Sequence, residues 1–135
     1  MTIRVLLVED YWEVRERLRI LLMQAPDIEL VGEATDGAEA LEMLERFPAE
    51  VVVMDLNMPE ISGIETTKRI LLEDPGIRVV IISLQSDPSY VKAGFRAGVT
   101  GYLLKDCAFE ELVEAVHIVA AGGSYVSPEI EIGVP

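Results

Sequence analysis

VVVMDLNMP, residues 51–59, is the stretch of sequence that decides the fold. Its first four residues are apolar at successive positions, which is typical of a strand covered on both faces within a parallel sheet. Asp55 follows this strand directly, and the nearest helix-capping motif begins only at Ser62. Since capping does not explain a charge at the end of a buried strand, we interpret Asp55 as a functional carboxylate.

Four more short apolar runs are distributed along the chain: IRVLLV (3–8), IELV (28–31), VVII (79–82) and GYLL (101–104). Between the runs, apolar residues recur at helical spacing, as in Val14, Leu18, Leu21 and Leu22, and again in Leu112, Val116, Val119 and Ala120. Three helix starts are marked by capping patterns at Asp36, Ser62 and Asp87-Pro88. The alternation predicts an α/β fold, a (βα)5 doubly wound five-stranded parallel sheet in the flavodoxin-like order 2-1-3-4-5.

The length of 135 residues suits one domain. We expect residues 1–122 to form that domain, since Gly122-Gly123 closes the last helix. Residues 123–135 then form a C-terminal tail or the start of a linker to an absent output domain, because Ser127-Pro128-Glu129 has the form of a new helix start.

Charge and hydropathy exclude several classes of partner. The formal net charge of −13 repels phosphate backbones, so we expect no unaided binding to nucleic acid. No apolar run approaches the roughly 20 residues of a membrane span, and the acidic N-terminus is unlike a secretory signal. The single cysteine, Cys107, has no partner for an internal disulfide. These features favour a cytoplasmic protein with no membrane partner.

The residues that end the predicted strands carry the candidate chemistry. In an open parallel sheet the carboxyl ends of the strands meet at one edge, near the point where the strand order reverses. That edge would gather three carboxylates, a hydroxyl and an ammonium: Glu9, Asp10, Asp55, Ser83 and Lys105. Three like charges require a counter-ion, and Mg²⁺ suits oxygen ligands of this kind.

In this order and spacing, Glu9-Asp10, Asp55-Leu56-Asn57-Met58-Pro59, Gly63, Ser83 and Lys105 resemble the signature of response-regulator receiver domains of two-component signalling. The resemblance extends over residues 3–122. It implies that Asp55 is the phosphoacceptor for a sensor histidine kinase, and that the domain is a switch assisting only its own phosphorylation and dephosphorylation, rather than an enzyme.

The same resemblance assigns the other site residues. Mg²⁺ would be held by Glu9, Asp10, Asp55 and the backbone carbonyl of Asn57. Ser83 and Lys105 would contact the phosphoryl oxygens, and Tyr102 would be the aromatic side chain that changes rotamer with Ser83 on activation. The residue after Ser83 is usually small in this family, whereas here it is Leu84, which puts the Tyr102 switch in question.

The segment VHIVAAGGSYVSPEI, residues 116–130, resembles the end of receivers of the NarL/FixJ subfamily. This implies a homodimer on phosphorylation, and a helix-turn-helix output domain, absent from this chain, through which alone DNA would be bound. The sole histidine, His117, is expected on the polar surface of the last helix. Trp12 is expected to pack against the site opening or to shield it.

Other functions are compatible with parts of the pattern. A stand-alone single-domain regulator and a phosphorylation-independent pseudo-receiver both keep the fold. A Mg²⁺-dependent phosphohydrolase would need an acid at Asn57, and a flavodoxin-like carrier would need a phosphate-binding loop where Glu9-Asp10 stands. The sequence identifies neither the cognate kinase, the target genes, the dimer surface nor the phosphoryl lifetime.

Overall fold

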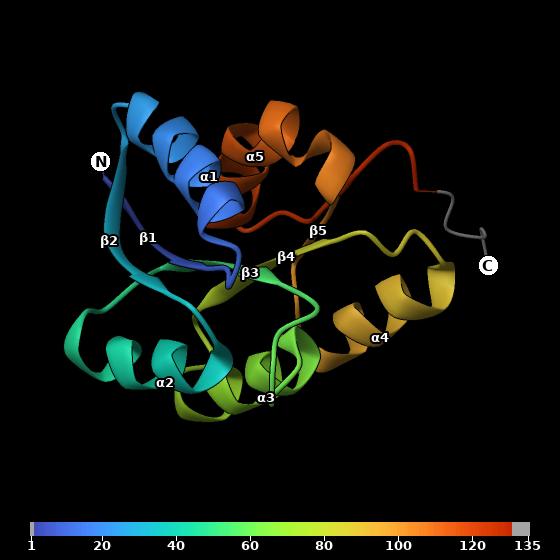
Figure 1. Ribbon diagram of the computed structural model, residues 1–135, viewed down its shortest axis with the longest axis horizontal. Coiled ribbons are helices and arrows are strands. Elements are labelled where there is room, and N and C mark those ends of the chain that lie inside the picture. Colours follow the sequence, from blue (N-terminus) through green and yellow to red (C-terminus); the bar gives the residue numbers. More distant parts are fainter. Residues whose placement is uncertain (1, 131–135) are drawn as a thin grey trace.

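The computed structural model of the chain describes residues 2–130, which form one parallel sheet between two layers of helices (Figure 1). Helices α1 and α5 cover one face of the sheet, and α2, α3 and α4 cover the other. The strands are β1 (Ile3–Val8), β2 (Ile28–Ala34), β3 (Val51–Asp55), β4 (Arg78–Ser83), β5 (Gly101–Leu104) and β6 (Tyr125–Val126), and the helices are α1 (Trp12–Gln24), α2 (Gly37–Arg46), α3 (Gly63–Glu73), α4 (Pro88–Ala97) and α5 (Lys105–Ala120). Among these helices, none is both long and apolar enough to cross a lipid bilayer.

The strand order is β2-β1-β3-β4-β5-β6, with every neighbouring pair parallel. The first five strands confirm the predicted order 2-1-3-4-5. Strand β3 lies at the centre and its side chains alternate between two cores. Val52 and Met54 belong to the core under α2, α3 and α4, whereas Val51 and Val53 belong to the core under α1 and α5. Because both faces are covered, the run VVVM is apolar at every position.

A sixth strand, β6, was not predicted. After α5 the chain turns at Gly122, whose φ of 98° lies in the left-handed region. It then returns along the open edge of β5, where the amides of Tyr125 and Ser127 donate to the carbonyls of Thr100 and Tyr102 at 2.9 and 3.0 Å. A two-residue strand is too short to produce a detectable sequence period.

The prediction that a new helix starts at Ser127 is wrong for the residues that the structure describes. Pro128 and Glu129 form a turn, in which the amide of Ile130 donates to the carbonyl of Ser127 at 3.0 Å. The Ser127 hydroxyl accepts a hydrogen bond from the amide of Leu104 at 3.0 Å instead of capping a new helix.

The three predicted capping sites are confirmed. The side chains of Asp36, Ser62 and Asp87 accept hydrogen bonds from the backbone amides that begin α2, α3 and α4, respectively. These caps satisfy amides that a helix leaves unpaired at its start. They therefore set where each helix begins and how long each preceding loop is.

Gly63 begins α3 directly beneath the loop that follows Asp55. Its amide donates to the carbonyl of Leu56 at 2.8 Å. A Cβ atom added at Gly63 would lie 2.5 Å from the carbonyl oxygen of Asp55 and 3.0 Å from the Cα of Leu56. Since both obstacles are backbone atoms, only glycine allows α3 to approach the end of β3 this closely.

We predict that Gly63→Ala lowers the free energy of unfolding by about 1–3 kcal/mol, although alanine is the better helix former. Urea denaturation would measure the loss. Gly76→Ala is the matched control, because its Cβ would meet only the Asp74 Oδ1 atom, at 3.4 Å. Equal stabilities of the two variants would contradict the proposed backbone clash.

Candidate functional site

Asp55 lies at the carboxyl edge of the sheet, as the last residue of β3. Its side chain is 3% exposed. The neighbouring strands β1 and β4 end beside it, which brings Glu9 and Ser83 to the same edge. The sheet order thus places side chains from distant parts of the sequence around one carboxylate.

Lys105 is the cation of this edge. It is the first residue of α5, and its Nζ atom lies 3.2 Å from Asp55 Oδ2 and 3.5 Å from Glu9 Oε1. Burial alone would lower the pKa of Lys105, but the charges of Asp55 and Glu9 outweigh burial and raise it above its ordinary value. Lys105 therefore stays an ammonium, held between two carboxylates.

Glu9 is buried, with 1% of its side chain exposed. Its Oε2 atom accepts a hydrogen bond from the amide of Tyr11 at 3.2 Å, whereas its Oε1 atom, although near Lys105, has no hydrogen-bond partner in the described part of the chain. Burial and then the charge of Asp55 raise the pKa of Glu9 to about 7. A buried carboxylate oxygen left without a hydrogen bond is suited to receive a cation or its water.

Asp10 completes the acidic group and is exposed. One carboxylate oxygen from each of Glu9, Asp10 and Asp55 lies within 4.8 Å of the others. Asp10 does not cap α1, since the N-cap residue is Tyr11, which makes no side-chain capping bond. The hard oxygen donors, their negative charge and the orphaned Glu9 oxygen together fit a Mg²⁺ ion.

The loop after β3 is built around Asp55. The amide of Asn57 donates to Asp55 Oδ1 at 3.2 Å, which fixes the rotamer of the carboxylate. Glu60, in the same loop, has a φ of 67°, in the left-handed region that non-glycine residues rarely occupy. No sequence signal predicted this conformation at a glutamate.

Ser83 and Tyr102 are joined through Gln85. The Ser83 hydroxyl, fully buried at the end of β4, accepts from the amide of Gln85 at 2.9 Å. The carbonyl of Gln85 accepts from the hydroxyl of Tyr102 at 2.9 Å. Tyr102 is fully buried, and this burial raises its pKa. Leu84 is 65% exposed, so its bulk does not occupy the interior in which Tyr102 lies.

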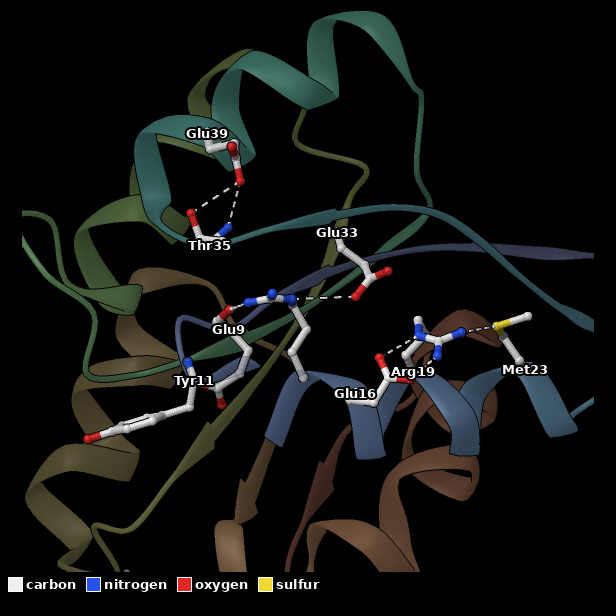
Figure 2. Close-up of polar contacts among 9 residues, drawn as sticks. Glu9, Tyr11, Glu16, Arg19, Met23, Glu33, Thr35 and Glu39 are labelled. Carbon is white, nitrogen blue, oxygen red and sulfur yellow. Dashed lines mark hydrogen bonds and ion pairs between the residues drawn. The ribbon is translucent and has the colours of Figure 1, made fainter. Parts of the chain in front are cut away.

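Arg15 is a site neighbour that the sequence analysis missed. Its Nη1 atom donates to the carbonyl of Glu9 at 2.7 Å, and its Nε atom lies 3.5 Å from Glu33 Oε1. Figure 2 shows Glu9, with Tyr11 beside it, and Glu33 on the neighbouring strand. Arg15 thus ties the first turn of α1 to the ends of β1 and β2. An arginine in a surface helix gives no sequence signal for such a contact.

Two residues outside this group are placed by the structure. His117 is partly exposed on α5, and its Nε2 atom lies 2.8 Å from Asp27 Oδ2, so it belongs to the surface as predicted. Trp12 begins α1 and is 65% exposed, which excludes close packing of its ring.

Comparison with known proteins agrees with this geometry. Residues 5–117 match the family described as response regulator receiver domain. The chain is 35% identical to the transcriptional regulatory protein DegU of Brevibacillus brevis, over 95% of this chain and 54% of that protein. It is 37% identical to UhpA of Escherichia coli (96% and 65%) and 35% identical to the nitrate/nitrite response regulator NarL of Escherichia coli (91% and 57%).

Solved structures show the same fold. A two-component response regulator of the LuxR family from Aurantimonas sp. SI85-9A1 superposes with a TM-score of 0.94 at 36% identity, covering 98% of this chain and 96% of that one. The receiver domain of NarL from Mycobacterium tuberculosis gives a TM-score of 0.85 at 32% identity, covering 90% and 98%.

The chain spans 54–65% of the length of the three curated relatives named above. The family match itself covers most of the chain, and the relatives and the superposed structures include regulators of the LuxR and NarL types. The chain therefore belongs to the response-regulator receiver domains of two-component signalling, and it resembles the NarL/FixJ subfamily, as the sequence predicted.

Proposed function

We propose that Asp55 accepts a phosphoryl group from a sensor histidine kinase. The observation that carries this proposal is the contact between the buried Asp55 carboxylate and Lys105, inside a group of three carboxylates at the sheet edge. An oxygen of Asp55 would attack phosphorus as the bond between phosphorus and the kinase's imidazole nitrogen breaks. Phosphoryl transfer depends mainly on positioning and charge neutralisation, so a further general base is not required.

The residues around Asp55 would share the positioning and the charge neutralisation. Lys105 already lies within 3.2 Å of Asp55, so a small movement would pair its ammonium with a phosphoryl oxygen. The Ser83 hydroxyl accepts from Gln85 and is free to donate its own proton to another phosphoryl oxygen. The Asn57 amide donates to Asp55 Oδ1, so Oδ2, the oxygen that faces Lys105, would be the one that reacts.

Mg²⁺ is the cofactor that this donor set fits. Glu9, Asp10 and Asp55 would hold the ion with the backbone carbonyl of Asn57, and the ion would supply positive charge for the phosphoryl oxygens. Glu9, being buried and hydrogen-bonded to the Tyr11 amide, would act mainly through a water molecule. Asp10, which is exposed, would be a direct ligand.

Phosphorylation would then change the surface formed by α4, β5 and α5. The added charge would pull Ser83 and its loop inward, and Tyr102 would respond through Gln85. In the cytoplasm this would control homodimerisation and a DNA-binding output domain beyond this chain, or a separate target if the receiver acts alone. The domain would assist only its own phosphorylation and dephosphorylation.

We predict that acetyl phosphate with Mg²⁺ adds one phosphoryl group to the protein, seen by intact mass, and that the group is stable to acid and labile to hydroxylamine. Asp55→Asn and chelation by EDTA should each abolish the gain, because they remove the nucleophile and the cation. Asp74→Asn, at an exposed aspartate outside the site, is the matched control and should be phosphorylated normally. Absence of any gain in the native protein would favour a phosphorylation-independent interaction module.

We also predict that the affinity for Mg²⁺ rises about tenfold between about pH 6 and pH 8. The pKa of Glu9 is raised to about 7, so a proton competes with the cation below that pH and no longer does so above it. Fluorescence of Trp12, the sole tryptophan, or calorimetry would follow binding.

Glu9→Gln should flatten this pH dependence, because the substituted amide does not titrate. Glu33→Gln, on the neighbouring strand, removes an acid outside the proposed ligand set and should keep the dependence. A steep pH dependence retained in Glu9→Gln would exclude Glu9 as the competing group.

A further inference from the structure

Residues 125–130, here called the tail strap, lie along the open edge of β5. Their backbone is fixed at two points, where the amides of Tyr125 and Ser127 donate to carbonyls of Thr100 and Tyr102. These bonds satisfy backbone groups that an edge strand would expose. These backbone bonds are sufficient to cover the edge of β5, so side-chain contacts of the strap point to a further role.

The strap is also held by side chains in the interior. Ser127 is 1% exposed, and its hydroxyl accepts from the Leu104 amide at 3.0 Å while donating to Glu111 Oε1 at 2.8 Å. The Tyr125 hydroxyl donates to the same Glu111 oxygen at 3.1 Å. One carboxylate on α5 therefore binds two hydroxyls of the strap.

The far end of the strap reaches the loop between β4 and α4. Ile130 is 6% exposed and belongs to the same buried apolar group as Tyr102 and Val91 of α4. Glu129 lines a polar hollow together with residues 84–88. The strap thus borders the loop that begins immediately after Ser83.

A continuous series of hydrogen bonds joins Ser83 to the strap. Ser83 accepts from the Gln85 amide, the Gln85 carbonyl accepts from the Tyr102 hydroxyl, and the Tyr102 carbonyl accepts from the Ser127 amide. Each bond is between 2.9 and 3.0 Å. These bonds give a route by which a displacement of the loop after Ser83 would reach Tyr102 and, through Tyr102, Ser127.

We propose that the tail strap is docked while Asp55 is unphosphorylated and detaches from β5 when Asp55 is phosphorylated. The inference rests on the proposed function, because the phosphoryl group is what would draw Ser83 and its loop inward. That movement takes the Gln85 carbonyl away from Tyr102 and residues 84–88 away from Glu129.

Hydrogen–deuterium exchange of the whole 135-residue chain tests this directly, with and without acetyl phosphate and Mg²⁺. The amides of Tyr125 and Ser127 donate to the carbonyls of Thr100 and Tyr102 at the sheet edge, so their exchange reports on docking. We expect their exchange to become at least fivefold faster in the phosphorylated protein, with phosphorylation measured on the same sample by intact mass. Strap protection unchanged in a fully phosphorylated sample would overturn the inference, whereas failure to phosphorylate would overturn the proposed function, and the inference with it.

Linkage supplies an independent test with a matched pair of serines. Ser127→Ala removes the buried hydroxyl, whereas Ser124→Ala removes an exposed hydroxyl, just before the strap, that makes no hydrogen bond within residues 2–130. If the undocked form is the one that is phosphorylated more readily, Ser127→Ala, which weakens docking, should raise the population of that form and speed phosphorylation by acetyl phosphate about three- to tenfold, and Ser124→Ala should match the native rate.

Tyr125→Phe, which removes one of the two hydroxyls on Glu111, should give a smaller acceleration and covers the case in which Ser127→Ala folds poorly. A strap with a purely structural role would lower the stability of these variants without changing the rate of phosphorylation of the folded protein. Equal rates in folded Ser127→Ala, Tyr125→Phe and native protein would therefore also overturn the inference.

Discussion

The candidate site is constrained by the repulsion between two buried carboxylates, Glu9 and Asp55, that share the ammonium of Lys105. Lys105 lies 3.5 Å from one and 3.2 Å from the other, and it balances only one of the two charges. Burial first, and then the charge of Asp55, raise the pKa of Glu9, and the nearby Lys105 offsets only part of the rise. Burial strengthens each interaction, because less water is present to screen it. Such an arrangement persists only where the backbone positions of all three residues are fixed by other forces.

Those forces come from the sheet. Strand β1 pairs with β3, and β3 pairs with β4, through apolar residues that are almost fully buried. The start of α5 adds Lys105 beside them, and the close approach of Gly63 anchors the loop after Asp55. The apolar packing thus supplies the free energy that holds like charges together, and the charges in turn form an acidic site suited to a cation.

Much of this arrangement was predictable because it depends on strong, periodic signals. Runs such as VVVM and VVII specify buried parallel strands, and the residues that follow them must meet at one edge. The sixth strand was missed since two residues carry no period, and the contact of Arg15 with the Glu9 carbonyl depends on the three-dimensional approach of α1 to β1. Leu84 was singled out because it stands where the family usually has a small residue, but the sequence does not show in which direction its side chain points. Leu84 is 65% exposed, whereas Tyr102 is fully buried.

The central position of β3 has a consequence for how such a domain changes over evolutionary time. Asp55 stands at the end of a strand with neighbours on both edges and helices over both faces, so the packing of the sheet fixes the position of its backbone. The outer faces of the surrounding helices contribute little to the position of Asp55. Substitutions on those faces can therefore change which proteins recognise the domain while its chemistry is preserved, and one inherited scaffold can be directed to many signalling partners.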